Sequence, residues 1–112
     1  MESFGTLARR MRKTRNLLLR EVAAKLQVDP SFLSRIEGGT KRASRGQVIQ
    51  LAAILEANEN EFLITYLSDK IIYELQGEKL AMKAMSVAEE KIRYFGNPAP
   101  TVKNSTTKDE GQ

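Results

Sequence analysis

The residues best suited to bind another molecule are Ser31, Ser34 and Arg35. Ser34 and Arg35 follow Ser31 at the helical spacings of three and four. Leu33 and Ile36 of the same segment are apolar, which predicts that the opposite side of this short helix is buried. The two hydroxyls and the guanidinium then share an outer face of hydrogen-bond donors with a positive charge. We therefore expect this face to lie against whatever the segment docks on.

The composition disfavours most enzyme chemistries. The chain has no cysteine and no histidine, which removes thiol nucleophiles, imidazole general bases, disulfides and zinc sites built from these residues. An enzyme would have to use a Ser/Lys pair, and neither a Gly-rich loop nor clustered carboxylates accompany one. We therefore expect no enzyme activity, no metal, no cofactor and no small-molecule substrate.

Basic residues are concentrated in the first part of the chain. Of the 112 residues, the first 45 hold eleven basic and four acidic groups, whereas the remainder holds seven basic and ten acidic groups. This asymmetry indicates one half that faces a polyanion and another half with a different task. Charge alone leaves open an ordinary solvated basic face.

Length and hydropathy predict one soluble domain. A chain of 112 residues has no room for separate catalytic and effector lobes. Its apolar runs are only a few residues long, and no charged segment followed by a hydrophobic one stands at Met1. We expect a cytoplasmic protein with no membrane contact.

The apolar residues predict helices along most of the chain. Helical stripes begin at Phe4 and at Leu19, and Asn16 between them tolerates a left-handed stop. The second stripe ends at Leu26, and only two residues separate it from Asp29 and Pro30. Asp29 and Pro30 predict a helix start, because Asp29 can cap the free backbone donors and Pro30 fits the first helical position. This third helix ends at Gly38 and Gly39.

Three further helices follow in the prediction. A capping box of Ser44 and Gln47 opens the fourth, and a second capping pattern at Asn58 opens a fifth, from about Glu59 to Gln76. The sixth spans residues 78–95, after Gly77. No stretch alternates well enough to be a strand, and residues 96–112 have no stripe to bury, so we expect a disordered tail.

The pair of short helices on either side of Gln27 and Val28 resembles the helix-turn-helix of the XRE family, the Cro and phage-repressor type of DNA-binding proteins. The resemblance runs from about Phe4 to Leu63. The residues that carry it are Arg12, Leu17 to Leu26 (LLLREVAAKL), Val28 to Gly38 (VDPSFLSRIEG) and the Leu51-Ala52 helix. It implies an all-α fold: a five-helix lambda-repressor-like helix-turn-helix domain with an additional C-terminal helix. The implied organisation is a DNA-binding domain over residues 1–63, a helical extension with a dimerisation role over 64–95, and the tail over 96–112.

The resemblance also implies which residues contact double-stranded DNA. The helix from Pro30 to Glu37 would lie in the major groove, where Arg35 can bond guanine O6 and N7 in bidentate fashion. The serines would contact bases or phosphates, and the other cations would fix register on the backbone. The complete expected set is Arg12, Arg20, Pro30, Ser31, Ser34, Arg35, Thr40, Lys41, Arg42 and Arg45.

Within this set, Arg12 is expected to support the fold first and to contact DNA second. In the family, the positions of Arg12 and Glu37 pair across the first and third helices.

The sequence departs from the family at two places. Gln27 stands where a glycine is usual, and Leu18 and Leu19 replace the usual Ser or Thr cap and Gln at the head of the second helix. The loss of that cap weakens the expected phosphate contact there.

The leading functional prediction is a sequence-specific, dimeric transcriptional regulator, either a bacterial or phage repressor or a restriction-modification controller. The alternative is a protein-interaction module, such as an antitoxin, that keeps the fold and binds a protein partner. The fifth and sixth helices carry more apolar surface than the five-helix domain needs. This surface forms a homodimer in one interpretation and folds back on its own domain in the other.

Overall fold

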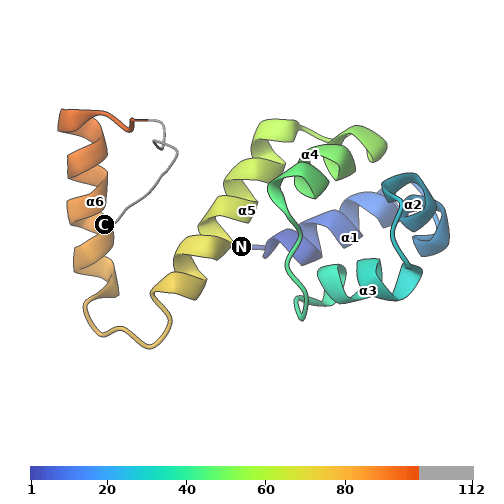
Figure 1. Ribbon diagram of the computed structural model, residues 1–112, viewed down its shortest axis with the longest axis horizontal. Helices are drawn as coiled ribbons and strands as arrows, with labels where there is room; N and C mark the ends of the chain where they lie inside the picture. Colours follow the sequence, from blue (N-terminus) through green and yellow to red (C-terminus); the bar gives the residue numbers. More distant parts are fainter. Residues whose placement is uncertain (99–112) are drawn as a thin grey trace, which may run out of the picture. The chain divides into compact units, whose positions relative to one another are not determined.

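The computed structural model describes residues 1–98, so residues 99–112, and with them most of the predicted disordered tail, lie outside it. The described residues form six helices and no strand (Figure 1). These are α1 (Phe4–Thr14), α2 (Leu19–Leu26), α3 (Pro30–Gly38), α4 (Arg45–Ile54), α5 (Glu59–Glu74) and α6 (Ala81–Phe95). The predicted all-α fold is confirmed. None of the helices within residues 1–98 is long and apolar enough to cross a membrane.

The chain divides into two compact units, of which the first is Met1–Glu74 and the second begins at Leu75. The first unit contains α1 to α5, and α5 belongs to it over its whole length. The predicted functional boundary after residue 63 falls inside α5 and stays a prediction.

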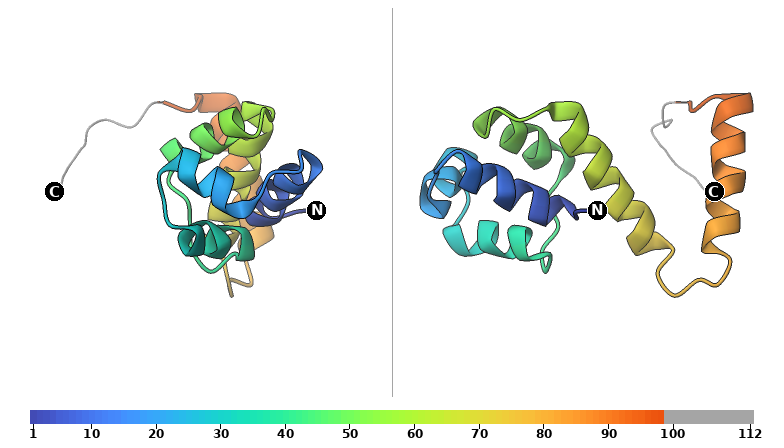
Figure 2. Two further views of the ribbon diagram at one scale, coloured as in Figure 1. Left: turned by 90° about the vertical axis from the view of Figure 1, so that its right-hand side faces the viewer. Right: turned by 180° about the vertical axis from the view of Figure 1, so that it is seen from behind.

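The hydrophobic core belongs to the first unit. α1 runs through the middle of this unit, with α3 along one edge and α4 on the opposite side (Figures 1 and 2). Each of the five helices contributes to one cluster, whose buried members are Phe4, Leu7, Ala8, Val22, Ala23, Leu26, Leu33, Ile36, Ala43, Val48, Leu51, Ala52, Leu55 and Phe62. The second unit has no buried residue in α6.

Gly5 allows α1 and α3 to pack in direct backbone contact. A Cβ placed on Gly5 would lie 2.4 Å from the carbonyl oxygen of Ile36 and 2.7 Å from that of Glu37. No side chain fits there, because both obstacles are backbone atoms of the neighbouring helix. The apolar stripe of α1 does not predict this requirement, since the stripe is helical whether or not residue 5 is glycine.

Most predicted helix ends are confirmed. Ser44 and Gln47 form the predicted capping box, with Gln47 N–H donating to Ser44 Oγ at 3.1 Å and Ser44 N–H donating to Gln47 Oε1 at 2.9 Å. Asn58 Oδ1 accepts from Glu61 N–H at 2.8 Å, as its capping pattern predicts. Asn16 has the left-handed φ of 57° expected of a stop residue.

Three details of the predicted ends are wrong. Asp29 occupies the position before α3, but its side chain accepts no capping hydrogen bond, and Pro30 alone matches its predicted role. The sixth helix begins at Ala81 instead of Glu78, because Lys79 and Leu80 form a turn and Leu80 has no side chain that caps a helix. The fifth helix ends at Glu74, two residues before the expected Gln76.

Candidate nucleic-acid interface

The turn between α2 and α3 keeps the helix-turn-helix geometry without its usual glycine. Gln27 adopts a left-handed conformation, with φ 63° and ψ 44°. Its N–H donates to the Ala24 carbonyl at 3.1 Å, and the N–H of Val28 donates to the Ala23 carbonyl at 3.0 Å. The side chain of Ala23 is fully buried and that of Val28 packs against the core, so both residues close the turn. The left-handed conformation costs Gln27 about 1 to 2 kcal/mol relative to glycine, which these bonds and contacts offset.

Helix α3 presents the predicted face to solvent. Leu33 and Ile36 are buried in the core, and Ser31, Ser34 and Arg35 are exposed. The helix lies at the edge of the first unit in the views of Figures 1 and 2. The two hydroxyls and the guanidinium therefore stand together on an accessible surface, as their spacing predicts.

An ion pair between α1 and α3 supports this helix. Arg12 Nε and Nη2 donate to the two carboxylate oxygens of Glu37 at 2.8 and 3.1 Å, and Arg12 Nη1 donates to the Leu17 carbonyl at 3.0 Å. The side chains are only 12% and 7% exposed. The hydrogen bond to Glu37 raises the pKa of Arg12, and partial desolvation opposes that rise. The predicted pairing is confirmed. All three guanidinium nitrogens have protein partners, and the phosphate contact of Arg12 stays a prediction.

The loop after α3 begins with a left-handed Gly39, with φ 84°. The N–H groups of Thr40 and Lys41 both donate to the carbonyl of Arg35, at 3.0 and 3.2 Å, so the loop folds back on the last turn of α3. Lys41 Nζ lies 5.8 Å from the centroid of the Phe32 ring. The basic loop residues therefore follow directly on the exposed face of α3.

Arg42, the next residue of this loop, contacts a different helix. The central carbon of its guanidinium lies 4.7 Å from the centroid of the Tyr73 ring in α5. Tyr73 was not expected in the interface, because no local sequence pattern signals a contact between residues so distant in the sequence.

The start of α2 lacks a side-chain cap from Leu18, as its sequence predicts. Glu21 compensates in part, because its Oε1 accepts from Leu18 N–H at 2.7 Å. A carboxylate at this helix start opposes the approach of a phosphate. The weaker phosphate contact expected there stays a prediction. Arg20, which directly precedes Glu21 in α2, is exposed.

The remaining residues of the expected set lie at helix starts. Pro30 opens α3 and Arg45 opens α4, and both are exposed. Within residues 1–98, no hydrogen bond or ion pair joins Arg20 or Arg45 to the exposed face of α3. Their part in DNA binding stays a prediction.

Comparison with known proteins identifies the class. A family model described as a helix-turn-helix domain matches residues 3–62, more than half of the chain, and the protein belongs to this family. Among solved structures, the chain is similar to the clp gene regulator ClgR from Corynebacterium glutamicum, with 22% identity and a TM-score of 0.53, over 84% of this chain and 92% of that one. At this identity the likeness shows the fold. No curated protein matches the sequence. The resemblance to helix-turn-helix proteins is thereby confirmed.

Removing one partner of the Arg12–Glu37 pair should destabilise the first unit strongly. We expect Arg12→Met or Glu37→Gln to lower the free energy of unfolding by about 3 to 5 kcal/mol, because each variant leaves the other side chain of the pair with a buried, unpaired charge. The double variant should lose less than the sum of the two single variants. Urea unfolding followed by circular dichroism measures these changes.

The matched control is Arg10→Met, which removes an equally short ion pair to Glu2, at 2.7 Å, on the exposed surface. We expect almost no change in its urea midpoint. Equal effects of the Arg10 and Arg12 variants would show that burial of the inner pair carries no special stability.

Proposed function

We propose that this protein is a sequence-specific DNA-binding transcriptional regulator that acts as a homodimer. The observation that carries the proposal is the row of Ser31, Ser34 and Arg35 on the exposed face of α3, within a chain of the helix-turn-helix family. The likeness in fold to ClgR, a gene regulator by its title, supports the same role. A repressor or a restriction-modification controller fits this description, because each requires a small protein that reads a DNA site.

Arg35 is the residue we assign to base recognition. Its side chain is exposed beside the two serines, and its guanidinium fits the paired acceptors of guanine in the major groove. Ser31 and Ser34 contribute weaker selectivity, because a hydroxyl bonds several kinds of acceptor. The exposed groups around α3 bind the phosphate backbone and fix the register; they are Arg20, Thr40, Lys41, Arg42 and Arg45.

The dimer is supported by the outer face of α5. The exposed Ile64, Leu67 and Ile71 lie three and four residues apart along this helix. The opposite face of α5 packs on the core through Phe62 and Tyr66. A helix buried on one face needs no second apolar face for its own fold, so the outer row fits a protein partner.

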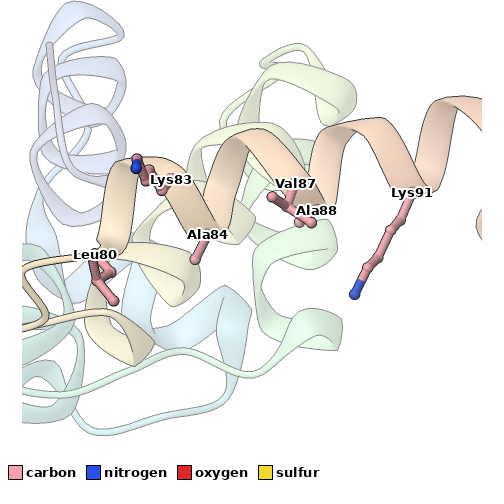
Figure 3. A pocket seen from close by; sticks show the side chains of 6 residues that line it. All are labelled: Leu80, Lys83, Ala84, Val87, Ala88 and Lys91. Atoms are coloured by element: carbon pink, nitrogen blue, oxygen red, sulfur yellow. The ribbon is translucent and has the colours of Figure 1, made fainter.

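Helix α6 carries a second exposed apolar surface. Leu80, Ala84, Val87 and Ala88 line a shallow hollow along it, bordered by Lys83 and Lys91 (Figure 3). The alanines leave room for a facing side chain, and the aliphatic stems of the lysines extend the apolar border. This surface fits the same role, since one helix-turn-helix reads only a few base pairs and a dimer reads two half-sites about one helical turn apart.

Arg35→Ala should relax sequence recognition while preserving general DNA affinity. On a preferred duplex selected from random sequence, we expect a loss of about 1 to 3 kcal/mol, whereas binding to unrelated DNA should change far less. Fluorescence anisotropy titrations on both duplexes measure the ratio.

Lys79→Ala is the charge-matched control, because Lys79 is exposed and lies outside the first unit. It should leave the ratio unchanged. An unchanged ratio for Arg35→Ala as well would contradict the assignment. Release of counterions makes the affinity for DNA fall steeply as the salt concentration rises. If the affinity of the wild-type protein for the duplex barely changes with salt, the result would favour a protein partner instead of DNA.

The dimer is tested with two neighbouring isoleucines of α5. Ile71→Glu places a charge in the outer apolar row and should shift the protein from dimer to monomer, as measured by light scattering at micromolar concentration. Ile72→Glu makes the same change one residue further, about 100° around the helix, and should leave the dimer intact. A wild-type protein that scatters as a 12.6 kDa species would contradict the dimer.

A further inference from the structure

The inner face of α5 carries four residues at spacings of four, three and four. The ring of Phe62 packs edge-on against the Phe4 ring, with centroids 5.4 Å apart, and that of Tyr66 packs against the same ring at 6.1 Å. Asp69 Oδ2 accepts the backbone N–H of Phe4 at 2.8 Å. The fourth residue, Tyr73, lies past the core, and 65% of its surface is exposed.

The partner of the Tyr73 ring is a cation of the proposed DNA interface. The Arg42 guanidinium carbon lies 4.7 Å from the ring centroid, well within the range of a cation–π contact. Because Tyr73 is largely exposed, its ring adds little to the core. Its contact with Arg42 links the last turn of α5 to the loop between α3 and α4.

This contact differs from those of the arginines that brace the first unit. Arg10, Arg12 and Arg15 pair with carboxylates of Glu2, Glu37 and Glu56 at 2.7 to 2.8 Å. A carboxylate neutralises the guanidinium and occupies its N–H groups. An aromatic ring carries no net charge and no carboxylate oxygens, so the positive charge of the guanidinium stays available to an anion.

We propose that Tyr73 is a positioning residue for DNA binding, which holds Arg42 in place so that its N–H groups meet a phosphate of the backbone. This inference rests on the proposed function and extends the interface to α5. A side chain already held in place loses less conformational freedom on binding, so the phosphate contact is stronger than that of a free arginine. The contact is not specific to base sequence, because it involves the backbone alone.

A double-mutant cycle with Arg42 tests the proposal. Tyr73→Leu removes the aromatic face, and Tyr73→Phe retains it. Affinity for a fluorescein-labelled duplex of random sequence should fall about two- to fivefold in Tyr73→Leu and stay unchanged in Tyr73→Phe. Arg42→Ala should reduce the slope of log K against log salt by about 0.9, the value of one phosphate contact. In the Arg42→Ala background, Tyr73→Leu should have no further effect.

Tyr94→Leu is the matched control, because Tyr94 is also a largely exposed tyrosine, on α6. The DNA affinity of this variant should match that of the wild type. The proposal is overturned if Tyr73→Leu binds DNA as well as the wild type, or if it weakens binding equally in the presence and absence of Arg42. Its failure is distinct from failure of the proposed function. If only the Tyr73 proposal fails, the wild type still binds DNA with Arg35-dependent selectivity. If the proposed function fails, the wild type binds no duplex at all.

Discussion

The burial of one side of α3 is the constraint on which the remaining features depend. A helix of nine residues is marginal in isolation, so α3 owes its stability to the packing of Leu33 and Ile36 in the core. Gly5 lets the backbone of α1 approach that of α3 directly. This packing sets the rotation of α3 about its axis, and the rotation in turn selects Ser31, Ser34 and Arg35 as the residues that face outward.

Two arginines of the first unit differ in the chemistry of their partners. Arg12 is enclosed by Glu37 and a backbone carbonyl, and its charge serves the fold. Arg42 contacts an aromatic ring and keeps its charge. A net count of basic residues does not separate these two kinds of arginine. The net charge of +4 also hides an uneven distribution, since the first 45 residues hold eleven basic and four acidic groups.

Much of the fold was predictable because the signals are local. Helical stripes and the Ser44–Gln47 box depend on residues within one or two turns, and the structure confirms them. The outward position of Arg35 followed from the same periodicity. The pairing of Arg12 with Glu37 spans two helices and was predictable only through the family resemblance. The contact of Asp69 with Phe4 N–H has no local signal, because it joins residues 65 positions apart. Asp29 failed as a cap because residue type permits that bond without determining the side-chain rotamer.

The central claim is that the outer face of α3 is the surface that meets DNA. The most direct measurement is an NMR titration of isotope-labelled protein with a duplex selected from random sequence. The account predicts that the largest changes in amide chemical shift occur at Ser31, Ser34 and Arg35 and in the loop through Arg42, with smaller changes on α6. Changes confined to α5 and α6, with the α3 signals unmoved, would contradict it.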